Sequence, residues 1–128
     1  MPTTLPTPVP QIPVRDLAAA IAFYQTKLGF SLDWKHENAI AGVSRDKARL
    51  FLNCATEEDL HPIRIWLNLD SVEEVDGLYH EWREAGVKIV EAPEQKPWGL
   101  YEFTVEDCTG NTYRVFYDTT TPRSSGRG

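Results

Sequence analysis

The sequence has few of the features that mark disulfide-rich or membrane-spanning proteins. Its only two cysteines, Cys54 and Cys108, show no CxxC spacing, and 128 residues suffice to form a core without disulfides. No run approaches the roughly 18 consecutive apolar residues of a transmembrane helix. The start, MPTTLPTPVP, lacks the basic and apolar regions of a signal peptide. We therefore expect reduced thiols and a cytoplasmic protein that does not bind a membrane.

The sequence also lacks an excess of basic residues. It has 13 lysines and arginines against 19 aspartates and glutamates, a net charge of −6. This balance argues against a nucleic-acid partner and mildly favours cationic ones. Solubility alone also explains an acidic surface, and charge by itself favours that simpler interpretation.

What is present predicts one domain with peripheral ends. Residues 1–7 are punctuated by prolines and predict an extended arm, while residues 119–128 have no apolar residue to anchor them and predict a flexible tail. The hydrophobic content of 41% is enough for a core between them. We expect a single folded domain over residues 8–118.

The first half of this region, residues 8–54, alternates between strand and helix periods. VPQIPV carries Pro10 and Pro13, which an edge strand tolerates and a central strand does not. Asp16 is placed to cap a helix with one apolar face, which Gly29 ends. Three short strands follow, in FSLDWK, IAGVSR and ARLFLNC.

The second half, residues 62–118, repeats that order. IRIWLNL alternates, so that Arg64, Trp66 and Asn68 share one face. Ser71 and Glu74 form a capping box for a second helix, followed by strands in VKIVEAP, LYEFTVED and NTYRVFYD. The sequence therefore predicts an α+β fold of two βαβββ modules, whose curved mixed sheets surround a ligand-binding cleft.

The segments PVRDLAAAIAFYQTKLGF and PWGLYEFTVEDCTGN, in this paired order, resemble the vicinal oxygen chelate superfamily, which includes glyoxalases, bleomycin resistance proteins and dioxygenases. Within it, VRDL, LGFSLDW, LYHEW and PWG followed by EF and GN resemble the bleomycin-binding resistance proteins. That resemblance implies a homodimer that sequesters drug between aromatic side chains, without chemistry or a cofactor.

Enzymes of the superfamily hold a divalent metal with His, Gln or Glu side chains from four strands. Aligned on the strand–helix joints and on GNTYRV, those four positions fall on Val9, Phe51, Arg64 and Arg114. None of these side chains suits a divalent metal. A shifted register leaves a weak alternative site, formed by Gln11, Asn53 and His61.

Aromatic, amide and carboxylate side chains are predicted to line the cleft instead. Such a surface suits a flat, partly cationic ligand. Trp98 is the strongest candidate, because Pro97 and Gly99 hold its large ring on a turn. Trp66, Phe51 and Trp34 suit packing equally well, and Trp82 is assigned to the core. The predicted ligand-binding residues are Asp33, Trp34, Ile40, Phe51, Asn53, Arg64, Trp66, Asn68, Trp98, Gly99, Tyr101, Glu102 and Gly110.

The resemblance supports Trp66, Trp98 and Asn53 most directly and also shows departures. Ile40 stands where the family has an aromatic residue, Cys108 replaces a usual proline, and one extra residue separates PWG from EF. The hypothesis is a metal-independent homodimer that sequesters a planar cationic antibiotic of the bleomycin type. Its N-terminal strand is suited to exchange between subunits. The alternatives are a metal-dependent lyase or dioxygenase, or a binder of another small molecule.

Overall fold

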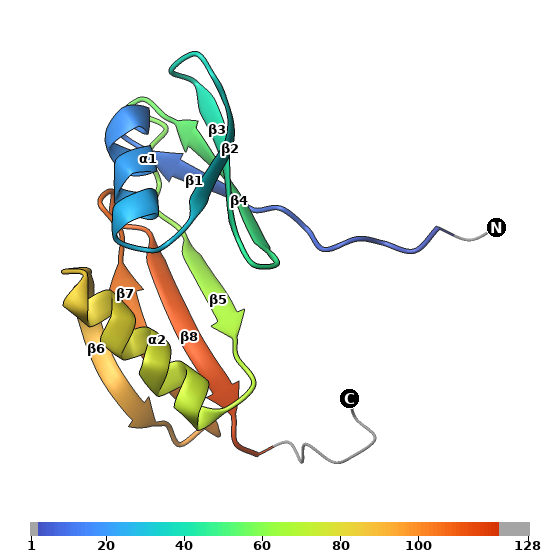
Figure 1. Cartoon of the computed structure of the whole chain (residues 1–128), viewed down its shortest axis with the longest axis vertical. Helices are drawn as coiled ribbons and strands as arrows, with labels where there is room; N and C mark the ends of the chain where they lie inside the picture. Colours follow the sequence, from blue (N-terminus) through green and yellow to red (C-terminus); the bar gives the residue numbers. More distant parts are fainter. Residues whose placement is uncertain (1–2, 121–128) are drawn as a thin grey trace. The chain divides into compact units, whose positions relative to one another are not determined.

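The computed structural model describes residues 3–120, so residues 1–2 of the expected arm and 121–128 of the expected tail lie outside it. The chain divides after His61 into two compact units, which are described separately. Each unit contains a four-stranded sheet with one helix packed on one face (Figure 1). Residues 3–10 form neither helix nor strand. Within residues 3–120, no helix combines the length and the apolar character needed to span a membrane.

The first module follows the predicted order. Its elements are β1 (Gln11–Val14), α1 (Leu17–Thr26), β2 (Ser31–His36), β3 (Ile40–Arg45) and β4 (Ala48–Cys54). The strand order is β1-β4-β3-β2, with β1 parallel to β4 and the other pairs antiparallel. The proline-bearing β1 is an edge strand, as predicted. Asp16 caps α1 by accepting a hydrogen bond from the backbone N–H of Ala19.

The second module repeats this topology. Its elements are β5 (Arg64–Asn68), α2 (Val72–Glu84), β6 (Lys88–Gln95), β7 (Leu100–Glu106) and β8 (Thr112–Asp118). The strand order is β5-β8-β7-β6, again with one parallel and two antiparallel pairs. The Ser71 hydroxyl accepts from the N–H of Glu74, which forms one half of the predicted capping box, and the Glu74 carboxylate accepts from the N–H of Asp70. The predicted α+β fold of two βαβββ modules is confirmed.

In the second module, α2 covers the face of the sheet that carries the odd-numbered residues of β7 and β8. Trp82 of α2 is 2% exposed, and its ring lies 6.1 Å from that of Phe103. Val105, Tyr113 and Val115 are buried with them. Burying each such apolar side chain contributes roughly 1.5–3 kcal/mol. The assignment of Trp82 to the core is therefore confirmed, and the opposite face of this sheet is left without a helix of its own module.

The connection between β7 and β8 is held by a buried carboxylate. Asp107 Oδ1 accepts from the backbone N–H groups of Thr109, Gly110 and Asn111 at 2.8–2.9 Å. The Asn111 side chain donates to Asp107 Oδ2 and accepts from the N–H of Ile63, which ties the start of β5 to this loop. Gly110 has a φ of 110°, which the turn requires of it. The GN motif thus stabilises this connection.

Strand β6 carries two irregularities that decide which side chains share a face. Ile89 pairs with Val105 and Glu91 with Thr104, so β6 has one residue more than β7 between these two pairs. A second extra residue of β6 lies between Glu91 and Glu94, which pairs with Glu102. Residues 91 and 94 would face opposite sides of a regular strand. The bulges instead bring both carboxylates to the helix-free face.

Candidate functional site

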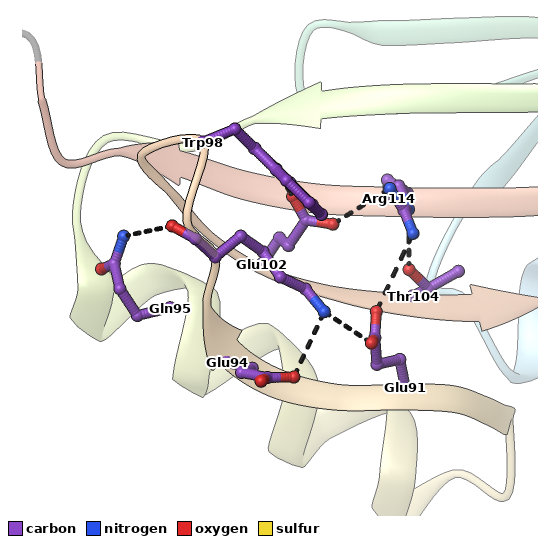
Figure 2. A network of polar contacts seen from close by, with 8 residues as sticks. Glu91, Glu94, Gln95, Trp98, Glu102, Thr104 and Arg114 are labelled. Carbon is purple, nitrogen blue, oxygen red and sulfur yellow. Dashed lines mark hydrogen bonds and ion pairs between the residues drawn. The ribbon is translucent and has the colours of Figure 1, made fainter.

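A network of charged and aromatic side chains lies on the helix-free face of the second sheet (Figure 2). Two neighbouring rows of cross-strand partners contribute to it. The first row runs through Trp66, Arg114, Thr104 and Glu91, and the second through Asn68, Phe116, Glu102 and Glu94. Because each row crosses all four strands, the register of the sheet fixes these positions.

Arg114 lies at the centre of the network. Its Nη1 is 3.2 Å from Glu102 Oε2, its Nη2 is 3.8 Å from Glu91 Oε1, and its Nε donates to Thr104 Oγ1 at 3.2 Å. The guanidinium carbon lies 5.2 Å from the centre of the Trp66 ring, a cation–π distance. Arg114 was predicted from sequence as a position unsuited to metal; the structure shows that it binds carboxylates.

Lys96 is the second cation of the network. Its ammonium donates to Glu91 Oε2 at 2.5 Å and to Glu94 Oε1 at 3.2 Å, and its side chain is only 10% exposed. The hydrogen bond from Lys96 lowers the pKa of Glu91, assisted by the charges of Lys96 and Arg114 and opposed by partial burial. The same bond raises the pKa of Lys96. Both groups therefore stay charged around neutral pH.

Trp98 sits on the turn between β6 and β7. The N–H of Gly99 donates to the Lys96 carbonyl at 3.0 Å, and the N–H of Lys96 donates to the Leu100 carbonyl at 2.8 Å, which closes a tight hairpin. Gly99 has a φ of 93°, and a β-carbon there would lie 2.3 Å from the Thr120 methyl group. The turn therefore needs glycine for both its conformation and its packing.

The Trp98 ring reaches back from this turn over the sheet, towards Glu102 and Arg114 (Figure 2). Its Nε1 donates to Glu102 Oε1 at 3.1 Å, and the Lys96 ammonium lies 5.7 Å from the ring centre. Trp98 is nevertheless 56% exposed and Trp66 is 45% exposed. Three carboxylates and two cations give the network a net charge of −1, with two accessible aromatic rings beside it.

The first module presents an aromatic face of its own. Trp34, Gly42, Phe51 and Gln11 occupy one row across its four strands. The rings of Trp34 and Phe51 are 5.2 Å apart in a T-shaped contact, and Trp34 lies so close to Gly42 that a β-carbon there would be 2.4 Å from its Nε1. A bulge at Asp33 puts Trp34 on this face. Trp34 remains 39% exposed.

The other predicted residues of the first module occupy less prominent places. Asp33 is exposed and accepts a hydrogen bond from the Ser44 hydroxyl at 3.0 Å. Ile40 and Asn53 are direct cross-strand partners, both half-buried, one row along from Gly42 and Phe51. Their register places them beside the aromatic row, so they stay candidates for its border.

The structure separates several predicted residues of the second module. Trp66, Trp98 and Glu102 come together, whereas the expectation that Tyr101 joins them is wrong. Its hydroxyl donates to Asp76 of α2 at 2.6 Å, which places it on the helix face and, with burial, raises its pKa to about 12. The exposed residues Arg64 and Asn68 share a face with Trp66. Gly110 lies beyond the opposite end of β7 from Trp98.

Sequence reasoning missed part of the network. The missed residues are Glu91, Glu94, Lys96, Thr104 and Phe116. The available signal was Pro93 within a strand, because proline inside a strand marks an edge or a bulge. The bulges themselves, and hence the common face of the two glutamates, are visible only in the structure.

Strand pairing shows which residues lie beside the positions that the sequence aligned with the metal ligands of superfamily enzymes. Arg114 pairs with Trp66 and not with Arg64, and Phe51 pairs with Gln11 and not with a residue at position 9. Val9 and Arg64 thus lie two residues before the cross-strand partners of Phe51 and Arg114. In residues 3–120, no group of three or more His, Cys, Asp and Glu side chains has an arrangement suited to a metal ion.

We compared the chain with known proteins and solved structures. No curated protein matched the sequence significantly. Among solved structures, a glyoxalase/bleomycin resistance protein/dioxygenase from Nocardioides is 21% identical, with a TM-score of 0.76 over 99% of this chain and 93% of that one. A lactoylglutathione lyase from Agrobacterium tumefaciens is 18% identical, with a TM-score of 0.74 over 92% and 98%.

A bleomycin-binding protein from Streptomyces verticillus, solved with copper(II)-bleomycin, is 24% identical, with a TM-score of 0.72 over 88% of this chain and 96% of that one. At these identities the structures establish the fold alone. The family profile described as Glyoxalase/Bleomycin resistance protein/Dioxygenase superfamily matches residues 7–115. The chain belongs to the glyoxalase/bleomycin resistance protein/dioxygenase superfamily.

Proposed function

We propose that this protein binds and sequesters a planar, cationic small molecule of the bleomycin type and performs no chemistry on it. The observation that carries this proposal is the pair of exposed rings, Trp66 and Trp98, beside a network with net charge −1. Exposed tryptophan rings that are rimmed by polar side chains are typical of a surface that binds a ligand or partner. Stacking on such rings contributes roughly 0.5–2 kcal/mol per contact.

The donor set does not fit the divalent metal that superfamily enzymes use. Such a site needs three or four converging nitrogen or oxygen donors. The paired positions of β5 and β8 hold Trp66 and Arg114, and those of β1 and β4 hold Gln11 and Phe51. Only Gln11 offers a donor among these four, and Arg114 adds positive charge. This favours a binding protein over a lyase or dioxygenase.

The charge pattern defines how a ligand would bind. Lys96 and Arg114 already lie within cation–π distance of Trp98 and Trp66. A flat ligand therefore stacks on the remaining exposed ring surface, while the surplus carboxylate charge favours a cation.

We also propose that the protein acts as a homodimer, as the bleomycin resistance proteins that it resembles do. Sedimentation equilibrium that gives a single monomer mass would refute that part.

Titration with copper(II)-bleomycin, followed by calorimetry and tryptophan fluorescence, tests the proposal. We expect saturable binding at micromolar drug, weakened roughly two- to thirtyfold in Trp98→Ala and in Trp66→Ala, which is what a loss of about 0.5–2 kcal/mol gives. Val90→Ala, which removes an equally exposed apolar side chain from β6, is the control and should bind normally. Absence of saturable binding to the native protein would exclude bleomycin as the ligand. A stoichiometric transition metal in protein purified without chelators would instead support an enzyme.

A further inference from the structure

One buried carboxylate connects the two exposed tryptophans of the second module. Glu102 is 0% exposed although it lies on the helix-free face. Its Oε1 accepts from the Trp98 indole N–H at 3.1 Å, and its Oε2 lies 3.2 Å from Nη1 of Arg114. Arg114 in turn lies over the Trp66 ring. One carboxylate oxygen of Glu102 therefore contacts the Trp98 indole, and the other faces the arginine that lies over Trp66.

Trp98 depends on this contact for its orientation. The ring projects from a tight turn and is more than half exposed, so packing restrains it weakly. A hydrogen bond from the indole N–H to an ionised carboxylate is about twice as strong as one to a neutral acceptor. Lys96, at 5.7 Å from the ring centre, supplies the only other polar contact recorded for this ring among residues 3–120.

The two oxygens of Glu102 differ in their hydrogen bonds. Despite its 3.2 Å separation from Arg114, Oε2 has no hydrogen-bond donor in acceptable geometry within the described residues. Buried carboxylates that serve stability alone usually have their acceptors satisfied. A buried carboxylate that holds an indole N–H with one oxygen and faces a guanidinium with the other is fixed in orientation, which suits a residue that positions its neighbours.

We propose that Glu102 is a positioning residue, which fixes the Trp98 indole directly and the Trp66 ring through Arg114, so that both rings are set for one planar ligand. The identity of the ligand in this inference rests on the proposed function. The coupling between the two rings does not depend on it. The coupling exists in the free protein and can be measured there.

The first test uses the ligand-free protein and the indole N–H resonances of its four tryptophans. Glu102→Gln keeps the shape of the side chain and removes its charge. We expect the Trp98 resonance to shift and its hydrogen exchange with water to accelerate, and the Trp66 resonance to shift as well. Those of Trp34 and Trp82 should stay in place. Glu106→Gln, which lies on the same strand and face but pairs with Lys88 outside this network, is the matched control.

A second variant covers the case in which Glu102→Gln does not fold. Trp98→Phe keeps an aromatic ring, of smaller area, on the turn and removes the donor to Glu102. Its effect should reach the Trp66 resonance through Glu102 and Arg114. An unchanged Trp66 resonance in this variant, or an unchanged Trp98 resonance in Glu102→Gln, refutes the positioning role.

The second test measures binding of copper(II)-bleomycin. Glu102→Gln and Trp98→Phe should each weaken binding about tenfold. The double variant should lose less than the product of the two losses, because one variant weakens the acceptor and the other removes the donor of the same hydrogen bond. Additive losses would refute the shared role. If the native protein does not bind the drug, the proposed function fails, whereas the resonance shifts still decide the positioning role.

Discussion

Replacing Arg114 with methionine should lower the free energy of unfolding by about 2–4 kcal/mol, because it leaves Glu102 buried without a counter-charge. Removing one partner of a buried ion pair costs about 3–5 kcal/mol. The Arg114 side chain is 21% exposed, so water reaches the site and the loss falls towards the lower end. The contact with Glu91, which is 35% exposed and 3.8 Å away, adds at most about 1 kcal/mol.

A double variant tests the dependence of Glu102 on Arg114 more sharply than the stability loss of Arg114→Met alone does. Arg114→Met combined with Glu102→Gln removes both charges, so the double variant should be more stable than Arg114→Met alone. Urea unfolding at neutral pH, with an unchanged m-value, measures both. Glu94→Gln is the control and should change stability by less than about 0.5 kcal/mol. A loss below about 1 kcal/mol, or a double variant less stable than the single one, would show that Glu102 does not need Arg114.

Three further predictions concern the turn, the first aromatic face and the helix face. Gly99→Ala should destabilise the fold by at least about 1–2 kcal/mol in urea, since its φ of 93° is strained for any other residue; an unchanged midpoint would contradict this. Gly42→Ala should displace the Trp34 ring and shift its fluorescence, at a cost of about 0.5–1.5 kcal/mol, and unchanged emission would exclude the close contact. Tyr101 should ionise with a pKa of about 12 in an ultraviolet titration, and Asp76→Ala should return that pKa towards 10.0. Because folding raises the pKa of Tyr101, its hydrogen bond stabilises the fold fully below pH 10, and this stabilisation is lost as the pH rises through 12. An equal Tyr101 pKa in the native protein and in the variant would refute the hydrogen bond.

The fold could be predicted because each local signal had a direct structural cause. The prolines of the first strand excluded a central position, and β1 lies at the edge of its sheet. Asp16 and Ser71 were read as helix caps, and each accepts a backbone N–H of the first helical turn. The repeated order of these signals was enough to specify two βαβββ modules.

The face of a side chain was predictable only where the strand is regular. Trp66 shares a face with Arg64 and Asn68, as predicted, because β5 alternates without interruption. Tyr101 was placed incorrectly because neighbouring strand residues face opposite sides, and it precedes Glu102. Glu91 and Glu94 were missed for the converse reason, since bulges override alternation in β6. The turn position of Trp98, by contrast, needed no register.

The structure changes how the acidic character of the candidate site should be understood. The sequence predicted Glu102 as a carboxylate suited to a cationic ligand, but Arg114 already pairs with it, and Lys96 pairs with Glu91 and Glu94 beside it. A simple ammonium ion would have to displace Lys96 or Arg114. These side chains belong to the protein chain, so their pairing costs less entropy than binding of a free ion does. Charge therefore gives a ligand limited advantage, whereas the exposed surfaces of Trp66 and Trp98 remain available for stacking. We infer that ring area contributes more to affinity than the number of positive charges on the ligand does.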